Sequence, residues 1–204
     1  MTWRYSGFVW LSVFRRPTYN SLASQSLREV HRILKVHGID VKQDSILKSI
    51  EMARAAGGII VMTNGCFDLL HVGHVRSLQE ARSLGTHLVV AVNNDESVRR
   101  LKGEDRPIVS LADRVETLQA LRPVDWVLTF GSESDDTPKS VVEKVRPDVL
   151  AKGGDYSLDE IVGSEFVRSY GGVVKALNFH DSWSTSKTIE HITSIVRRRK
   201  TSDS

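Results

Sequence analysis

Cysteine is nearly absent from this chain of 204 residues: Cys66 is the only one, so no disulfide can form within the chain. A secreted scaffold stapled by disulfides is thereby excluded, and the expected compartment is the cytosol. Long apolar runs are also missing, because the longest candidate, residues 7–14, falls well short of the ~18 residues that a membrane-spanning helix needs. The sequence has neither an internal repeat nor a low-complexity segment. We therefore expect a globular, cytoplasmic protein that does not span a membrane.

A strong excess of one charge is missing as well, since 28 Lys and Arg residues face 25 Asp and Glu residues, a net charge of +3. Residues 1–57 carry 9 basic and 4 acidic side chains, and residues 197–204 carry 4 and 1. The intervening residues 58–196 carry 15 and 20, a net charge of −5. The basic character thus belongs to the two ends, and a solvated tail explains it better than a nucleic-acid contact.

The length and the composition, 40% hydrophobic and 26% charged residues, are typical of one globular domain with an extension. Residues 1–43 form the predicted N-terminal extension, which is partly helical because residues 26–37 have apolar side chains at helical spacing. A second helix over 44–57, with Asp44 as its N-cap, opens the main domain, which we expect to cover residues 44–200.

From residue 59 onward, short apolar runs alternate with helical patterns. Five strands are predicted over 59–62, 87–92, 126–130, 148–151 and 173–179. Helices are predicted over 73–84, 111–121, 138–144 and 185–197, and residues 94–109 read as a polar loop. This alternation favours an α/β fold, a doubly wound parallel five-stranded sheet covered by helices on both faces.

In a doubly wound sheet, ligands bind beyond the carboxyl ends of the strands, so the loop after the first strand is the place to look. It reads TNGCFDLLHVGH over residues 63–74. His71 and His74 lie three residues apart at the start of a helix, so that both rings lie on one face beside the helix N-terminus. Free N–H groups and the helix dipole favour an anion there, and two imidazoles complete a cradle for a phosphate. Gly65 is expected to let the strand end turn, and Gly73 to leave room for a ligand.

Other interpretations of this loop exist. Each histidine alone is better explained as a structural residue, and Cys66 as a small buried side chain. A zinc site formed by Cys66 with the histidines lacks a second cysteine and a standard spacing, so no metal ligand is assigned. The joint occurrence of strand, glycine, Asp68 and two histidines is more specific than any one of them and favours the phosphate site.

The string HVGH at 71–74, following GCFD, resembles the signature of the nucleotidyltransferase superfamily of cytidylyltransferases and adenylyltransferases. The longer string most closely resembles the adenylyltransferase domains that make ADP-heptose from D-glycero-β-D-manno-heptose 1-phosphate. Further blocks continue the resemblance in register over about residues 44–195, and residues 1–43 do not match. These blocks are AVNNDES (91–97), RLKGEDRP (100–107), the helix with Arg114, VDWV (124–127), PDVLAKGGDY (147–156) and FHDSWSTSKTI (179–189).

The resemblance implies a Rossmann-like nucleotidyltransferase fold and a transfer of AMP from ATP to a sugar 1-phosphate, with Mg²⁺ as cofactor and a homodimer as assembly. Its catalytic residues would be His71, His74 and Lys102. Its nucleotide-binding residues would be Thr63, Asn64, Gly65, Cys66, Phe67, Gly73, Lys152, Gly153, Asp155, Ser184, Thr185 and Ser186. Its substrate-binding residues would be Asp68, Asp95, Arg106 and Arg114.

Each of the later blocks also has an ordinary structural explanation. The cations of residues 99–106 suit a solvated loop, residues 152–155 a tight turn, and one of the hydroxyls of residues 184–186 a helix N-cap. Three alternatives to the heptose enzyme remain. A cytidylyltransferase for glycerol 3-phosphate or a related alcohol has the same fold, an FAD synthetase shares the reaction, and a non-catalytic nucleotide-binding module would keep the fold alone. A tRNA synthetase is disfavoured because the chain has no room for an anticodon-binding domain.

Overall fold

The computed structural model describes residues 43–154, 157–178 and 184–202. Two compact units divide the chain between Asp40 and Val41, and the described residues all lie in the second. The predicted extension 1–43, with its helix 26–37, therefore lies outside the described residues except for its last position. None of the described helices combines the length and the apolar composition that a membrane-spanning helix requires.

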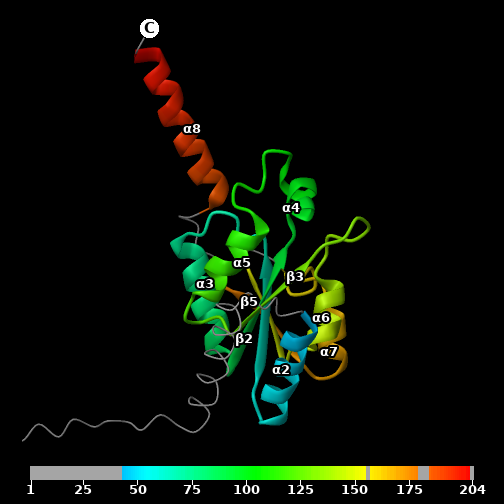
Figure 1. Cartoon of the computed structure of the whole chain (residues 1–204). Helices are drawn as coiled ribbons and strands as arrows, with labels where there is room; N and C mark the ends of the chain where they lie inside the picture. Colours follow the sequence, from blue (N-terminus) through cyan, green and yellow to red (C-terminus); the bar gives the residue numbers. More distant parts are fainter. Residues whose placement is uncertain (1–42, 155–156, 179–183, 203–204) are drawn as a thin grey trace, which may run out of the picture. The chain divides into compact units, whose positions relative to one another are not determined.

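Five parallel strands form one sheet in the order β3-β2-β1-β4-β5 (Figure 1). The strands are β1 (Ile60–Gly65), β2 (His87–Asn93), β3 (Trp126–Phe130), β4 (Val149–Gly153) and β5 (Val173–Leu177). The three central strands are apolar along most of their length, and all residues from Leu88 to Val92 are fully buried. Such unbroken apolar runs are what a parallel sheet with two covered faces requires. The predicted fold class is confirmed.

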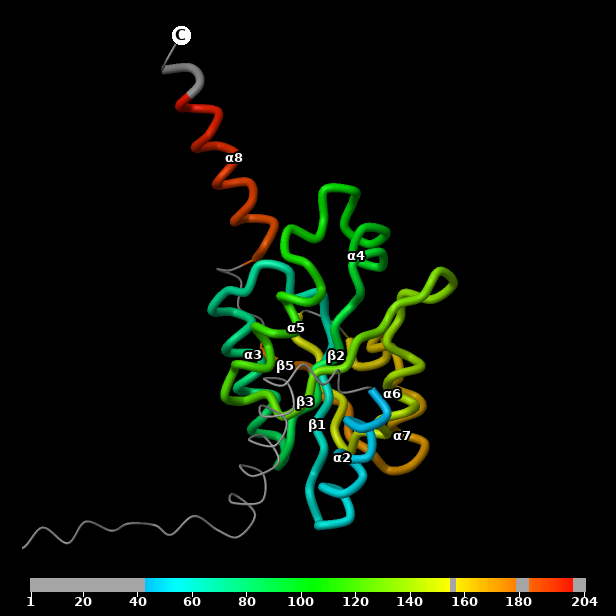
Figure 2. The backbone as a smooth tube through the Cα atoms, viewed as in Figure 1, coloured from blue at the N-terminus to red at the C-terminus, as the bar shows by residue number. Residues whose placement is uncertain are grey.

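Helices cover both faces of this sheet (Figure 2). On one face, α3 (Val72–Ser83) and α5 (Leu111–Gln119) contribute Leu78, Ala81 and Leu118 to a core with the strand residues that point toward them. On the other face, α2 (Gln43–Ala55), α6 (Lys139–Val145) and α7 (Ser164–Ser169) form a second core. The sheet is therefore the middle layer of three. Because helices cover both faces, a ligand can reach the sheet only at the ends of its strands.

The predicted polar loop 94–109 is wrong over its first half, where α4 (Asp95–Lys102) forms. The side chain of Asn94 caps this helix by accepting a hydrogen bond of 2.7 Å from the N–H of Ser97. Acidic residues occupy its first turn and basic residues its last turn, an arrangement that complements the helix dipole. The sequence pattern does not predict α4, because only Ser97 and Val98 are buried and no apolar stripe marks the helix.

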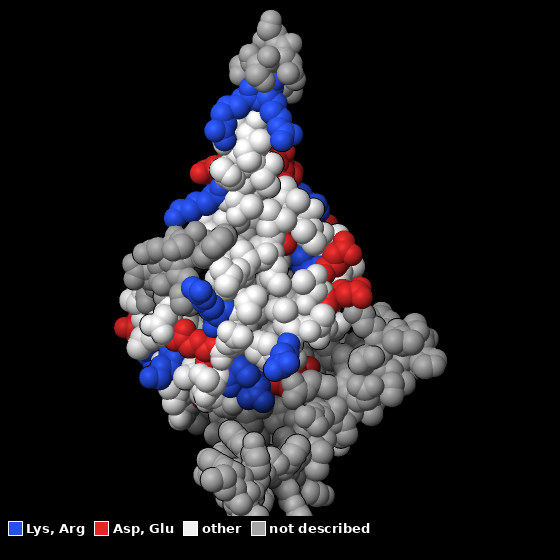
Figure 3. Space-filling model, turned by 90° about the vertical axis from the view of Figure 1, so that its left-hand side faces the viewer, with Lys and Arg blue, Asp and Glu red and all other residues white. Residues whose placement is uncertain are grey.

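Other differences from the predicted elements are smaller. Strand β1 continues to Gly65, so residues 63–65 of the expected loop belong to the strand. Helix α7 was not predicted, and Pro138 is the N-cap of α6 where the sequence suggests a first-turn position. Helix α8 (Thr185–Ser202) extends beyond the predicted end at residue 197, and exposed basic side chains gather toward its far end (Figure 3), among them Arg197, Arg198 and Arg199.

Candidate active site

The site lies where the strand order reverses. Strand β1 is flanked by β2 on one side and by β4 on the other, so the chain winds outward in both directions from this point. The loops that follow β1 and β4 leave the same edge of the sheet, because parallel strands all end there. Ligands of doubly wound sheets bind in the crevice at this switch point. The histidine loop (residues 66–74) follows β1, and Lys152 and Gly153 end β4.

His71 and His74 bind to each other's backbone at the start of α3. His71 is the N-cap; its Nδ1 accepts from the N–H of His74, and Nδ1 of His74 accepts from the N–H of His71, each at 3.4 Å. The two rings stack with their centroids 3.8 Å apart. A neutral imidazole whose Nδ1 accepts carries its proton on Nε2. The reciprocal cap thus leaves each ring with an Nε2–H donor for a ligand.

Both histidines are kept neutral near pH 7. Burial, together with the neighbouring His71, lowers the pKa of His74 to about 4. Burial also lowers the pKa of His71. The ring of Phe67 packs on His74 with centroids 5.3 Å apart and covers it. At physiological pH the pair therefore offers hydrogen bonds and not positive charges.

The turn between β1 and the histidines is made at Phe67, not at the glycine that the sequence suggests. Phe67 has φ +48°, in the left-handed region, whereas Gly65 is not among the residues with positive φ. A Cβ on Gly65 would lie 3.1 Å from Cε2 of Phe67, a tight contact, so the glycine leaves room for the Phe67 ring. Thr63 is buried on β1, Asn64 and Gly65 are half-buried there, and Gly73 is buried in the first turn of α3.

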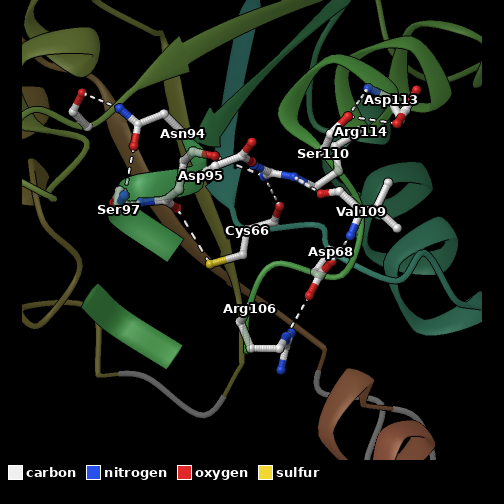
Figure 4. Close-up of polar contacts among 12 residues, drawn as sticks. Cys66, Asp68, Asn94, Asp95, Ser97, Arg106, Val109, Ser110, Asp113 and Arg114 are labelled. Carbon is white, nitrogen blue, oxygen red and sulfur yellow. Dashed lines mark hydrogen bonds and ion pairs between the residues drawn. The ribbon is translucent and has the colours of Figure 1, made fainter. Parts of the chain in front are cut away.

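Arg114 is a buried tie between the strand ends (Figure 4). Its side chain is 0% exposed, and every guanidinium nitrogen donates a hydrogen bond. Nη1 donates to the carbonyl oxygens of Cys66 at 2.6 Å and Asn93 at 2.9 Å, Nε to that of Val109 at 3.0 Å, and Nη2 to the carboxylate of Asp95 at 2.7 Å. These contacts join Arg114 to the segments after β1 and β2 and to the residues before α5, and the substrate contact expected of Arg114 from the sequence stays a prediction.

Asp68 holds the segment that leads from α4 to α5. Its carboxylate accepts from Nε of Arg106 at 2.5 Å and from the N–H of Val109 at 2.9 Å, as Figure 4 shows. Burial by itself would raise the pKa of Asp68, but the backbone N–H groups of Val109 and Ile108 and the side chain of Arg106 lower it. Both predicted substrate-binding carboxylates are thus paired with arginine, Asp68 with Arg106 and Asp95 with Arg114.

The charges of several Lys and Arg side chains act on the thiol of Cys66. Nζ of Lys152 reaches from β4 to β1 and donates to the carbonyl oxygen of Asn64 at 3.1 Å. Burial raises the pKa of the Cys66 thiol, while the charges of Lys102, Arg114 and Lys152 partly oppose the rise. Burial lowers the pKa of Lys152. A thiol with a raised pKa is a poor nucleophile at pH 7, whereas the surrounding positive charge suits an anionic ligand.

The start of α8 lies against the histidine loop. Oγ of Ser184 caps the helix by accepting from the N–H of Lys187 at 3.1 Å, and Oγ1 of Thr185 donates to the carbonyl oxygen of Leu69 at 3.3 Å. Ser186 is exposed. A cavity of about 570 Å³ opens between the histidine loop, α3 and α8. It is lined by Leu69, Leu70, His71, Val72, Arg76 and Thr188. Sequence reasoning missed Arg76, which lies one helical turn after Val72 on the same side of α3.

The structure brings most of the predicted residues to one edge of the sheet. Lys102 is exposed at the end of α4, where the sequence suggests a loop. Gly153 ends β4, and Gly154 follows with φ +123°, a conformation that favours glycine. Asp155 lies outside the described residues. In the part of the chain that is described, no group of three or more His, Cys, Asp or Glu side chains could hold a metal ion.

Comparisons with known proteins match this arrangement to a family. A family model described as "Cytidylyltransferase-like" matches residues 62–199. A protein named "Bifunctional protein HldE" from Alcanivorax borkumensis is 55% identical over 152 residues, which are 74% of this chain and 31% of that protein. The protein of the same name from Shewanella piezotolerans is 48% identical over 168 residues, 82% of this chain and 34% of that protein.

A solved structure titled "Crystal structure of the lipopolysaccharide core biosynthesis protein from Thermoplasma volcanium GSS1" is 34% identical, with a TM-score of 0.49, and the match covers 59% of this chain and 94% of that one. The chain spans about a third of the length of the curated relatives named above. The matching family model takes in β1 from Met62, the histidine loop, α4 with Lys102, β4 with Lys152, and the start of α8. With more than half of its residues in that match, this chain belongs to the cytidylyltransferase-like family.

Proposed function

We propose that this chain is an adenylyltransferase that transfers AMP from ATP to D-glycero-β-D-manno-heptose 1-phosphate, giving ADP-heptose and pyrophosphate. The observation that carries the proposal is the pair of neutral, stacked histidines that cap α3 at the switch point of the sheet. Curated relatives about 50% identical to this chain, named "Bifunctional protein HldE", support the assignment together with the sequence blocks that resemble heptose 1-phosphate adenylyltransferases.

The reaction needs charge stabilisation more than acid–base catalysis. An oxygen of the sugar phosphate, already ionised at pH 7, attacks the α-phosphorus of ATP and forms a new P–O bond. The bond from the α-phosphorus to the bridging oxygen breaks, and pyrophosphate leaves with that electron pair. Two anions must meet in this step, so positioning and electrostatic stabilisation supply most of the rate enhancement.

The two histidines would bind the α- and β-phosphates through their Nε2–H groups. Neutral donors at fixed positions stabilise the crowded transition state without a proton transfer. Because each Nδ1 already accepts a backbone N–H, rotation or a change of tautomer would break a cap hydrogen bond. The rings are therefore oriented before the substrate arrives.

Cations and hydroxyl groups would bind the remaining phosphates. Lys102 and Arg106 would neutralise the incoming sugar phosphate, and the hydroxyls of residues 184–186 would bind the leaving pyrophosphate. Backbone groups at Lys152 and Gly153 would recognise the adenine edge. Mg²⁺ would enter with ATP, held mainly by its phosphates and by water as this ion commonly is, because Asp68 and Asp95 are paired with arginines.

A turnover assay with a panel of nucleotides and sugar phosphates tests the proposal. We expect pyrophosphate release from ATP with heptose 1-phosphate, and a preference for ATP over CTP of about ten- to a thousandfold in kcat/KM. A wrong base leaves buried hydrogen-bonding groups unpaired at ~1–3 kcal/mol each. If kcat/KM with CTP equalled that with ATP, the assignment as an adenylyltransferase would be wrong, but the assignment as a nucleotidyltransferase would stand. If no combination of nucleotide and sugar phosphate gave turnover above that of His74→Ala, the chain would be a non-catalytic nucleotide-binding module.

We further propose a homodimer, which the family resemblance implies, and a cytosolic location, which the near absence of cysteine favours. Light scattering at micromolar concentration would test the dimer, since a single species near the monomer mass of 22.8 kDa would overturn it.

A further inference from the structure

Helix α4 is fixed at its N-terminal end by asparagines. Asn94 caps the helix, and its Nδ2 donates to the carbonyl oxygen of Gly131 at 2.8 Å. Nδ2 of the buried Asn93 donates to Oγ of Ser97 at 2.9 Å. These contacts attach the first turn of α4 to the end of β2 and to the segment after β3. They do not reach the last turn, which carries Lys102.

Arg100 attaches that last turn to the segment between β3 and α6. Its Nε donates to Oδ2 of Asp136 at 2.9 Å and its Nη2 to Oδ1 at 2.6 Å, so the pair is bidentate. Nη2 also donates to the carbonyl oxygen of Ser132 at 2.6 Å. The backbone oxygen of Asp136 in turn accepts from Nδ2 of Asn93 at 3.3 Å. Bidentate arginine–carboxylate pairs add geometric specificity that a single contact lacks.

Lys102 lies on the other side of this helix. Two residues along an α-helix correspond to about 200°, so Arg100 and Lys102 project in nearly opposite directions. The segment that follows Lys102 returns to the histidine loop, where Arg106 binds Asp68. The Lys102 charge accordingly acts on the pKa values of Cys66, after β1, and of Lys152, on β4. One face of α4 therefore holds the β3–α6 segment, and the opposite face presents a cation to the nucleotide site.

We propose that Arg100 is a positioning residue of the active site: its bidentate pair with Asp136 fixes the last turn of α4 and thereby the place of Lys102. The inference rests on the proposed function for its catalytic consequence, because Lys102 matters only where a phosphate must be neutralised. Small displacements of a positioned group cost large factors in rate, so an anchor at the last turn of this eight-residue helix can affect turnover through Lys102.

Arg99 provides the matched comparison. It is exposed in the same turn of the same helix and carries the same charge, so the sequence alone treats Arg99 and Arg100 alike. The carboxylate of Asp136 and the carbonyl oxygen of Ser132 bind Arg100. A difference between alanine variants at the two positions therefore reports the anchor and not the loss of a positive charge.

The test is a double-mutant cycle with Lys102. We expect Arg100→Ala to lower kcat about tenfold with little change in KM for ATP or in Tm, Arg100→Lys to recover part of the loss, and Arg99→Ala to change kcat less than twofold. In a Lys102→Ala background, Arg100→Ala should have no further effect, because the group that it positions is gone. Equal losses in both backgrounds, or no loss in either, would overturn the inference.

Hydrogen exchange separates this inference from the proposed function. Amides in residues 99–103 should exchange several-fold faster in Arg100→Ala than in the wild type, and Arg99→Ala should match the wild type. Unchanged exchange in Arg100→Ala would overturn the anchor, whatever the turnover. If Arg100→Ala exchanged faster but the wild type showed no turnover with any substrate pair, the anchoring role of Arg100 would stand and the proposed function would be rejected.

Discussion

The histidine loop and the end of α4 are held in place by opposite means. Buried contacts fix the loop: Arg114 holds its first carbonyl oxygen, Asp68 pairs with Arg106, and the two histidines cap each other. Exposed contacts fix the end of α4, where Arg100 is 38% and Asp136 23% exposed. The histidines proposed to stabilise the transition state lie on the buried side. Lys102, the cation proposed to meet the incoming substrate, lies on the exposed side.

Loss of the buried Arg114 side chain should have the largest effect on stability. Arg114→Met keeps most of the side-chain volume but leaves three carbonyl oxygens and the Asp95 carboxylate without their donor. We expect the free energy of unfolding to fall by about 3–5 kcal/mol, the usual cost of breaking a buried charged network. Urea denaturation measures it, with Arg99→Met, an exposed neighbour of the site, expected within ~0.5 kcal/mol of the wild type. A loss below ~1 kcal/mol would show that the loop is fixed by other contacts.

His74→Ala tests whether the buried side supplies transition-state stabilisation. We expect the fold to persist and kcat to fall by ~10²–10³, about 3–4 kcal/mol, because one oriented N–H donor is lost. Steady-state kinetics with circular dichroism as the folding check measure the effect. His191→Ala, an exposed histidine on α8, serves as control and should retain full activity. A near-normal kcat in His74→Ala would remove this residue from the chemistry.

Lys102→Ala tests the exposed side, where the effect should be smaller and confined to catalysis. We expect kcat/KM for the sugar phosphate to fall about ten- to a hundredfold, which corresponds to ~1.4–2.8 kcal/mol. The free energy of unfolding should stay within ~0.5 kcal/mol of the wild type, since the side chain is exposed. If Lys102→Ala instead destabilised the protein as strongly as Arg114→Met does, the distinction between the two sides would fail.

The pH dependence of stability should show the neutral histidine. The pKa of His74 is about 4 in the folded protein, against about 6.5 in an unfolded chain, so between these values the unfolded state binds more protons. The stability contributed by this group is complete above pH 6.5 and is lost as pH falls toward 4. We expect a decrease of about 1–2 kcal/mol between pH 7 and pH 5. Urea denaturation of the wild type and of His74→Ala at several pH values measures this. The same dependence of the free energy of unfolding on pH in both proteins would contradict it.

Local patterns allowed much of the fold to be predicted. The apolar runs of β1 and β2 need no partner to be recognised, because burial on both faces makes them continuously hydrophobic. The position of His71 and His74 at a helix start also follows from local signals, the end of a strand and the onset of helical spacing. Helix α4 escaped prediction because it buries only Ser97 and Val98 and thus has no apolar stripe.

The chain by itself determined the order of strands and helices and the residue types at the switch point, since both are properties of short segments. Only the tertiary structure decided that Arg114 is buried, that Phe67 makes the turn, and that Arg100 differs from Arg99. Asp136 is 36 residues from Arg100, and Cys66 is 48 residues from Arg114. Contacts at such separations exist only once the sheet has brought the strand ends together, and no local pattern records which distant oxygen a guanidinium will meet.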